Sequence, residues 1–129
     1  MPAPSPKNLV FFLSDNHACG YLGAYGNPDV KTPHIDRLAK EGVRFENCYA
    51  QNPICGPSRC SLMTGWYLHV PARKWSNSSV LHPHQPSLFR YLREAGYHVG
   101  WHGKNDLYSP DYFPLAVSHA SGHDRPPGS

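Results

Sequence analysis

Five consecutive apolar residues, Leu-Val-Phe-Phe-Leu at positions 9–13, constrain the fold of this chain more than any other feature. An uninterrupted apolar run of this length is typical of a strand that is buried on both faces, as in a parallel sheet. The polar residues Ser14, Asp15 and Asn16 follow directly, at the end of the strand where open α/β sheets bind ligands. The run therefore predicts an α/β fold with a largely parallel sheet flanked by helices.

Helical and extended patterns alternate after this run, which supports the same class. A helix is indicated where Thr32 and Pro33 form a start signal and Gly42 a stop signal. Another amphipathic pattern, with apolar residues three and four positions apart, ends at Gly96. The sequence thus predicts helices over residues 32–42, 57–65 and 87–95, short strands over 43–47 and 97–101, and irregular structure over 66–86.

The length and the end of the chain suggest one domain with a tail. A chain of 129 residues is long enough for one domain. Periodicity is lost after Ser109, and the last residues have the composition of a disordered end. We expect a catalytic domain over residues 1–109 and an irregular, disordered tail over residues 110–129.

The charge and hydropathy of the chain exclude several classes. The net charge of +3 comes without a run of Lys or Arg, which argues against a nucleic-acid partner but is compatible with an anionic substrate. No apolar stretch approaches the ~20 residues that span a membrane. The N-terminus lacks the basic start and long apolar region of a signal peptide. We therefore expect a cytoplasmic protein without membrane contact, or a periplasmic or secreted one if a signal was removed.

Of the four cysteines, Cys55 has the most distinctive surroundings. The cysteines form no CxxC pair, so a zinc site is not indicated. Cys55 lies just before a predicted helix N-terminus, where backbone amides and the helix dipole favour an anion. Arg59, four residues on, would add a positive charge near the same turn. An incidental Cys before a Pro-capped helix would give the same spacing, so the pattern alone leaves both interpretations open.

The segment around Cys55 resembles the signature of the sulfatase family, within the alkaline-phosphatase-like superfamily. The likeness consists of Cys-x-Pro-Ser-Arg at positions 55–59 and Leu-x-Thr-Gly at positions 62–65. Flanking segments resemble further family blocks in the same order: residues 8–15, 25–28, 31–39, 41–45, 92–97 and 103–104. The resemblance covers roughly residues 8–108. It implies the N-terminal part of an alkaline-phosphatase-like fold, whose remaining strands and second metal-binding pair would come from the rest of a longer sulfatase chain. We expect this chain on its own to be inactive.

The resemblance also implies a mechanism for hydrolysis of a small-molecule or saccharide sulfate ester. Cys55 would be oxidised by a separate formylglycine-generating enzyme, and one hydroxyl of the hydrated aldehyde would attack sulfur and expel the alcohol. The second hydroxyl would then lose its proton, which releases sulfate and restores the aldehyde. Carried over by position, Cys55, Arg59 and Lys104 are catalytic, and Lys104 also contacts sulfate. Asp15, Asn16 and the modified Cys55 would bind Ca²⁺ or another divalent cation, which prefers oxygen ligands and acts as a Lewis acid.

Two departures from the family pattern concern the charge of the site. Asn16 stands where the family commonly has a second acid, which lowers the negative charge available to a metal. Asp106 stands where the family commonly has His, and we expect His102 as a substitute contact to the substrate. His17 and His69 are further candidates near the site. Each assignment has a structural alternative: a turn at residues 15–16, a solvated lysine at position 104, and structural histidines.

Two other functions remain open at this point. The same nucleophile motif occurs in related hydrolases of phosphonate or phosphate esters. An inactive fragment that acts only as a binding module is the third alternative.

Overall fold

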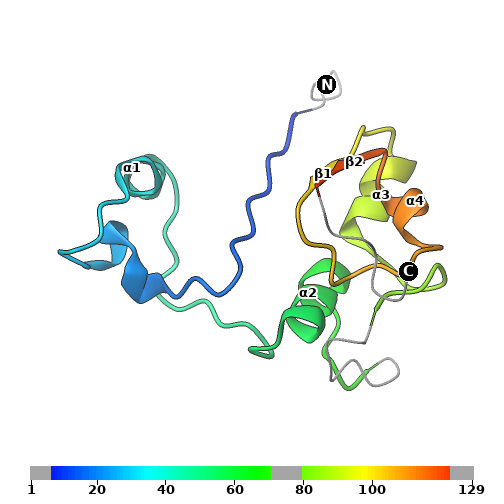
Figure 1. The fold of residues 1–129 in the computed structure, drawn as a ribbon, viewed down its shortest axis with the longest axis horizontal. Coiled ribbons are helices and arrows are strands. Elements are labelled where there is room, and N and C mark those ends of the chain that lie inside the picture. The colour runs from blue at the N-terminus through cyan, green and yellow to red at the C-terminus, as the bar shows by residue number, and fades with distance from the viewer. Residues whose placement is uncertain (1–6, 71–79, 123–129) are drawn as a thin grey trace, which may run out of the picture. The chain divides into compact units, whose positions relative to one another are not determined.

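The computed structural model describes residues 7–70 and 80–122. The chain divides into two compact units, Met1–Asn47 and Cys48–Ser129, and each is described by itself (Figure 1). The first unit contains two 3₁₀ turns, η1 (Cys19–Tyr21) and η2 (Gly23–Tyr25), and helix α1 (Pro33–Glu41). The second contains α2 (Cys55–Thr64), α3 (Leu88–Glu94), β1 (Gly100–His102), α4 (Phe113–Ala116) and β2 (His119–Ser121). In the described residues, no helix has the length and apolar character that spanning a bilayer requires.

Helix α1 confirms the start and stop signals of its sequence. Pro33 occupies its first turn, and the Gly42 amide donates to the Leu38 carbonyl at its end. The Thr32 hydroxyl does not cap the helix. It donates to Asp36 Oδ1 at 2.8 Å and accepts from the Gly23 amide at 2.9 Å, which ties α1 to η2.

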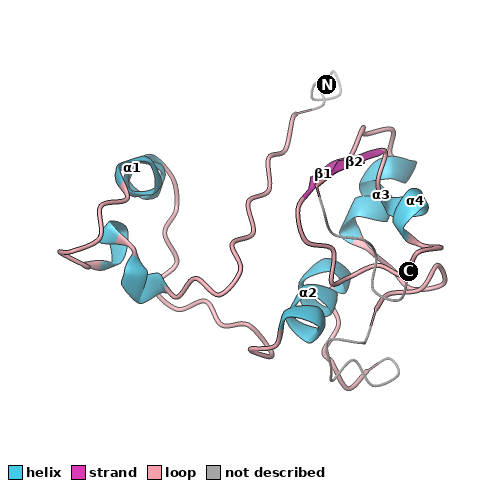
Figure 2. Cartoon of the chain, in the orientation of Figure 1, coloured by secondary structure: helices cyan, strands magenta, loops and turns pink. Residues whose placement is uncertain are grey.

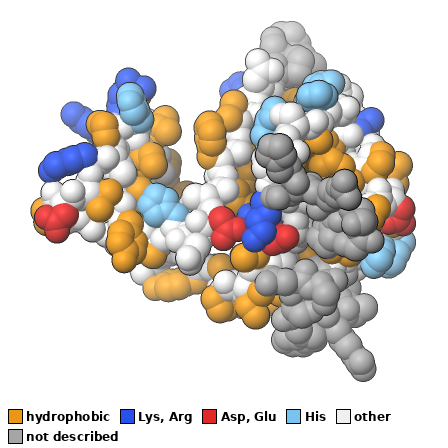
Figure 3. Space-filling model, viewed as in Figure 1, with side chains coloured by type: hydrophobic (Ala, Val, Ile, Leu, Met, Phe, Trp, Pro, Cys, Tyr) orange, Lys and Arg blue, Asp and Glu red, His pale blue; other side chains and the backbone are white. Residues whose placement is uncertain are grey.

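The predicted strand at residues 9–13 is wrong for this structure. These residues run as an extended segment without strand pairing, and Val10 and Phe12 are 72% and 89% exposed. The physical reason is that a strand needs a hydrogen-bonded neighbour, and the described part of the first unit contains no strand that could pair with this run. Figure 2 shows the segment as loop, and Figure 3 shows many hydrophobic side chains at the surface of the face that it draws.

The predicted strand at residues 43–47 is also not formed. Tyr25 holds this segment through its side chain instead: its hydroxyl donates to the Phe45 carbonyl at 2.8 Å. The Arg44 guanidinium lies 5.3 Å from the centre of the Tyr25 ring and pairs with Glu46. Side-chain contacts therefore replace the hydrogen-bond ladder that the alternating pattern predicted.

The second unit has a small α/β arrangement around one hydrophobic core. Strands β1 and β2 pair in parallel, with Gly100 opposite His119, and α4 lies in the connection between them. A parallel bridge between Leu81 and Tyr108 adds a second extended contact. Helices α2, α3 and α4 and the segments between them contribute the buried side chains of the core (Cys60, Met63, Leu81, Phe89, Val99, Leu107, Tyr108, Tyr112, Ala116 and Val117). The α/β class is thus observed, with two strands and one bridge among the described residues.

Residues 110–122, expected as part of an irregular tail, are folded in part and contribute side chains to this core. They form α4 and β2, and Tyr112 and Ala116 are fully buried. Arg93 at the end of α3 donates to the carbonyls of Pro114 at 3.0 Å and Val117 at 2.6 Å. The rest of the predicted tail, residues 123–129, lies outside the described residues, as do residues 71–79 of the predicted irregular segment.

Candidate functional site

Helix α2 fixes the position of Cys55. The sequence placed this residue just before a helix, and in the structure Cys55 is the first residue of α2. The Ile54 amide donates to Asn52 Oδ1 at 2.8 Å, which holds the chain as it enters the helix. Pro57 is tolerated in the first turn because amides there have no intrahelical acceptor. Cys55 is half-buried and lies at the positive end of the helix dipole, where negative charge is favoured.

Arg59 connects this helix with the loop that carries Lys104. One helical turn, about 5.4 Å of rise, separates Arg59 from Cys55. The Arg59 side chain is buried, and its Nη1 donates to the main-chain oxygen of Lys104 at 3.4 Å. The structure therefore links α2, the helix that begins at Cys55, to the main chain of Lys104.

The loop of Lys104 is held from inside by Asn105. The Asn105 side chain is 1% exposed; its Nδ2 donates to the Tyr108 carbonyl at 2.8 Å, and its Oδ1 accepts from the Tyr108 amide at 3.0 Å. Gly103 and Asp106 flank this anchor with positive φ angles of 89° and 32°. The sequence analysis missed Asn105; the signal was a Gly-Lys-Asn-Asp run, whose residue types are common in turns.

The charge of the loop is partly compensated. Lys104 Nζ lies 2.7 Å from Asp106 Oδ2, with 42% and 24% of the two side chains exposed. Together with Arg59 the segment carries two positive charges and one negative charge. Cationic side chains with a partly compensated charge can bind an oxyanion.

The histidines predicted near the site have different positions. His102 ends β1 on the exposed side, and its Nδ1 is hydrogen-bonded to Ser121 Oγ of β2. His69 follows the C-terminal end of α2 and stacks on Tyr67 at 5.8 Å between ring centres, whereas Cys55 begins that helix. His17 lies in the first unit, 3.5 Å from the Tyr21 carbonyl through Nε2. Only Gly103 separates His102 from Lys104, so His102 is the nearest of the three in sequence to the Lys104 loop.

Asp15 and Asn16 lie together in the first unit, directly after the extended run. Both side chains are exposed, and Asn16 has a positive φ of 52°, as Asn tolerates better than most residues. A carboxylate and an amide oxygen fit a hard divalent cation in kind. Within residues 7–70 and 80–122, no three His, Cys, Asp or Glu side chains gather as a metal-binding group.

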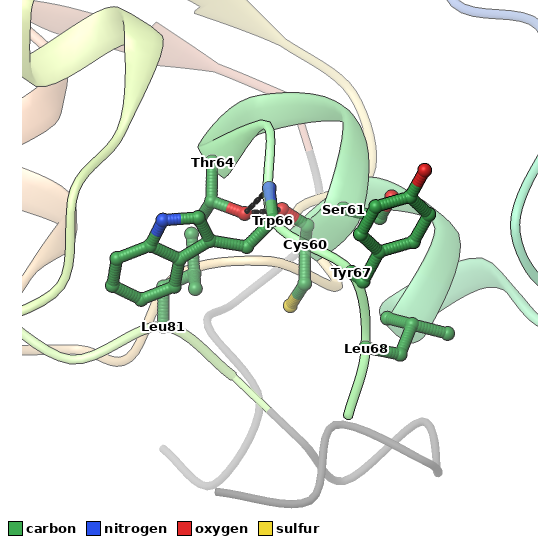
Figure 4. A pocket seen from close by; sticks show the side chains of 7 residues that line it. All are labelled: Cys60, Ser61, Thr64, Trp66, Tyr67, Leu68 and Leu81. Carbon is green, nitrogen blue, oxygen red and sulfur yellow. Dashed lines mark hydrogen bonds between the residues drawn. The ribbon is translucent and has the colours of Figure 1, made fainter. Parts of the chain in front are cut away.

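A shallow pocket lies at the other end of α2 from Cys55. Figure 4 shows the Cys60 thiol between Trp66 and Leu81 on one side and Tyr67 and Leu68 on the other. The Thr64 hydroxyl donates to the Cys60 carbonyl at 2.7 Å and accepts from the Trp66 amide at 3.1 Å, so this end of the helix is structurally satisfied. None of the predicted site residues lines the pocket.

Known proteins with similar sequences are sulfatases. The chain matches the family described as Sulfatase over residues 7–128. It is 37% identical to the N-acetylglucosamine-6-O-sulfatase of Bacteroides thetaiotaomicron over 102 residues, which cover 79% of this chain and 18% of that protein. It is 36% identical to human N-acetylgalactosamine-6-sulfatase, covering 88% of this chain and 24% of that protein. It is 37% identical to the ulvan-active sulfatase of Formosa agariphila, covering 78% of this chain and 20% of that protein.

The chain therefore spans about a fifth of the length of these relatives. No solved structure matches it significantly.

Proposed function

The chain belongs to the sulfatase family, and from this premise we propose that the protein hydrolyses sulfate esters with a formylglycine formed from Cys55. The observation that carries the proposal is the hydrogen bond from Arg59 Nη1 to the Lys104 carbonyl. It joins the helix that begins at Cys55 to the main chain of the Lys104 loop, which supports the proposal that Cys55, Arg59 and Lys104 act in one site.

Each of these residues has a distinct task in the proposal. The formylglycine supplies the hydroxyl nucleophile at position 55. Arg59, which is buried and contacts the Lys104 carbonyl, holds the formylglycine hydroxyl. Lys104, whose side chain is exposed, binds a sulfate oxygen of the substrate. His102 is a further substrate contact in the proposal, because it ends the strand that leads into the Gly103 turn.

Asp15 and Asn16, with the modified residue 55, are the proposed ligands of a divalent cation, with Ca²⁺ the preferred choice. Their oxygen donors match the ligand preference of hard cations. When bound, such a cation supplies Lewis-acid polarisation of a sulfate oxygen. In this proposal Asp15 supplies a negatively charged oxygen to the cation, and Asn16 supplies a neutral one.

The partners of this chemistry are a sulfated small molecule or saccharide, a formylglycine-generating enzyme, and the remaining part of a sulfatase chain. The family relatives support a sulfate ester as the substrate class, since all three are sulfatases by name. No observation of the structure favours phosphonate or phosphate esters, or a binding module without activity, over this proposal.

The test is turnover of 4-nitrophenyl sulfate by the full-length natural protein, produced together with a formylglycine-generating enzyme. We expect hydrolysis that stops in the Cys55→Ala variant, and Cys48→Ala serves as the matched control because Cys48 is an exposed cysteine of the same unit. Hydrolysis of 4-nitrophenyl phosphate without hydrolysis of the sulfate would contradict the proposal. Equal activity of the Cys55→Ala variant and the unsubstituted protein would also contradict it.

A further inference from the structure

The ion pair between Lys104 and Asp106 places a carboxylate beside the lysine that binds the substrate anion in the proposed function. The two charged atoms lie 2.7 Å apart, and the Asp106 side chain is the less exposed of the two. The position of the carboxylate is set by the backbone, because Asp106 has a positive φ of 32° and the buried Asn105 side chain anchors the loop next to it. The structure of the loop therefore fixes the position of the Asp106 carboxylate next to Lys104.

A carboxylate at this position distinguishes substrates by their charge and not by their shape. A sulfate monoester carries a single negative charge on its tetrahedral head group. A phosphate monoester has the same shape but approaches two negative charges above pH ~6. Asp106 repels both, and the repulsion grows with the charge of the substrate, so it weakens binding of the doubly charged ester more.

Resting on the proposed function, we propose that Asp106 is a specificity-determining residue that selects singly charged over doubly charged tetrahedral esters. Lys104 and Asp106 together are neutral, so Asp106 lowers the positive charge that this loop offers to a substrate anion. A lower positive charge favours a monoanion over a dianion. It also means that the selectivity follows charge rather than the element at the centre of the ester, so a phosphonate monoester, which carries one charge, is treated like a sulfate.

The experiment compares three aryl esters at pH 8 with the full-length natural protein in its formylglycine form: 4-nitrophenyl sulfate, 4-nitrophenyl phosphate and 4-nitrophenyl phenylphosphonate. In Asp106→Asn we expect the sulfate-to-phosphate ratio of kcat/KM to fall by about two- to five-fold, the range that one exposed charge pair produces. The sulfate-to-phosphonate ratio should stay unchanged, because both of these substrates are singly charged.

Two further variants, Asp106→Gly and Glu94→Gln, test whether a change in the kcat/KM ratios comes from the charge of Asp106 and not from a change in folding. Asn and Gly both tolerate positive φ, so Asp106→Asn and Asp106→Gly each remove the charge without straining the loop, and both should shift the ratio in the same direction. Glu94→Gln is the matched control, because it removes a carboxylate from another exposed ion pair of the same unit, that with Arg90 on α3. It should leave both ratios unchanged.

The outcomes separate this inference from the proposed function. Sulfate turnover with an unchanged sulfate-to-phosphate ratio in both Asp106 variants overturns the role of Asp106 and leaves the sulfatase activity standing. A ratio that falls equally in Glu94→Gln also overturns it, since the effect would then be one of overall charge. Absence of sulfate turnover in the unsubstituted protein overturns the proposed function, and the selectivity with it.

Discussion

Arg59 Nη1 donates a hydrogen bond to the main-chain oxygen of Lys104 at 3.4 Å, across 45 positions of sequence. The bond joins α2 to the loop between β1 and the Tyr108 bridge, and the guanidinium is buried where it does so. A buried charged group in such a place has to be satisfied, so the contact couples the stability of the unit to the geometry of the proposed site.

Replacement of Arg59 by Ala should therefore destabilise the protein. We expect a loss of about 1–3 kcal/mol in the free energy of unfolding, because the buried Arg59 side chain is removed and the Lys104 carbonyl loses this donor. The free energy of unfolding of Arg59→Lys should lie between the values of Arg59→Ala and the unsubstituted protein. Lys keeps the positive charge but lacks the planar guanidinium group. Urea unfolding followed by circular dichroism measures the effect. Arg37→Ala, at an exposed position of α1, is the control, and an equal loss in both variants would contradict the coupling.

Conversion of Cys55 to formylglycine should be detectable directly. After co-expression with a formylglycine-generating enzyme, peptide mass analysis should show loss of the thiol and gain of an aldehyde at position 55. Cys60 is the internal control: it lies five residues further along α2, is 2% exposed and lacks a Pro two positions later. An unmodified Cys55 under these conditions would remove the proposed nucleophile.

Asp15→Ala should abolish calcium-dependent turnover in the full-length natural protein. Loss of a direct ligand should exceed the roughly 10–100-fold that loss of an outer-shell partner costs. The measurement is the rate of aryl sulfate hydrolysis as a function of calcium concentration. Asp29→Ala removes another exposed carboxylate of the first unit and should have little effect. Full activity of Asp15→Ala would mean that the metal assignment is wrong.

Local signals in the sequence predicted local structure well. Helix α1 follows from Thr32, Pro33 and Gly42, because start and stop signals act on the backbone within one turn. The spacing of Cys55 and Arg59 followed in the same way from the helical repeat. The contact of Arg59 with Lys104 could not be predicted, because no periodic pattern relates residues 45 positions apart.

Features that depend on a distant partner were predicted poorly. The run at residues 9–13 has the composition of a buried strand, but composition does not supply the neighbour that a strand requires. Conversely, α4 and β2 have four and three residues, too few for a periodic pattern, and α4 contains Pro114. Arg93 holds this segment through the carbonyls of Pro114 and Val117, so tertiary contacts determine its structure.

The exposed apolar run should bind a hydrophobic dye in the 129-residue chain. Val10 and Phe12 are its most exposed side chains, at 72% and 89%. The double variant Val10→Lys/Phe12→Lys should lower the fluorescence of a bound naphthalene sulfonate dye, because charged side chains interrupt the apolar surface. Val43→Lys replaces an exposed apolar residue outside the run and is the control. Equal fluorescence of the double variant and the unsubstituted chain would contradict this reading of the surface.

The stability of the second unit should fall as the pH rises above about 10, and Tyr108 should account for part of that fall. Burial raises the pKa of the Tyr108 phenol above its usual value, and its hydrogen bond with Ser87 opposes the shift. Burial also raises the pKa of Tyr112. The folded state therefore keeps protons that the unfolded chain loses at a pKa of about 10. This contribution to stability is fully present below that pH and is lost as the pH rises toward the folded-state pKa.

The Tyr108→Phe variant separates the contribution of the Tyr108 phenol from the other contributions to the loss of stability at high pH. At pH 7 it should cost about 1–3 kcal/mol, because the fully buried Ser87 hydroxyl loses its Tyr108 partner. Above pH 10 its stability should decline less steeply than that of the unsubstituted protein, with Tyr112 responsible for a remaining slope. Urea unfolding at several pH values between 7 and 11 measures both quantities. Tyr49→Phe, at a position that is 84% exposed, should change neither. Parallel pH profiles for Tyr108→Phe and the unsubstituted protein would show that the phenol titrates alike in the folded and unfolded states, which would contradict this prediction.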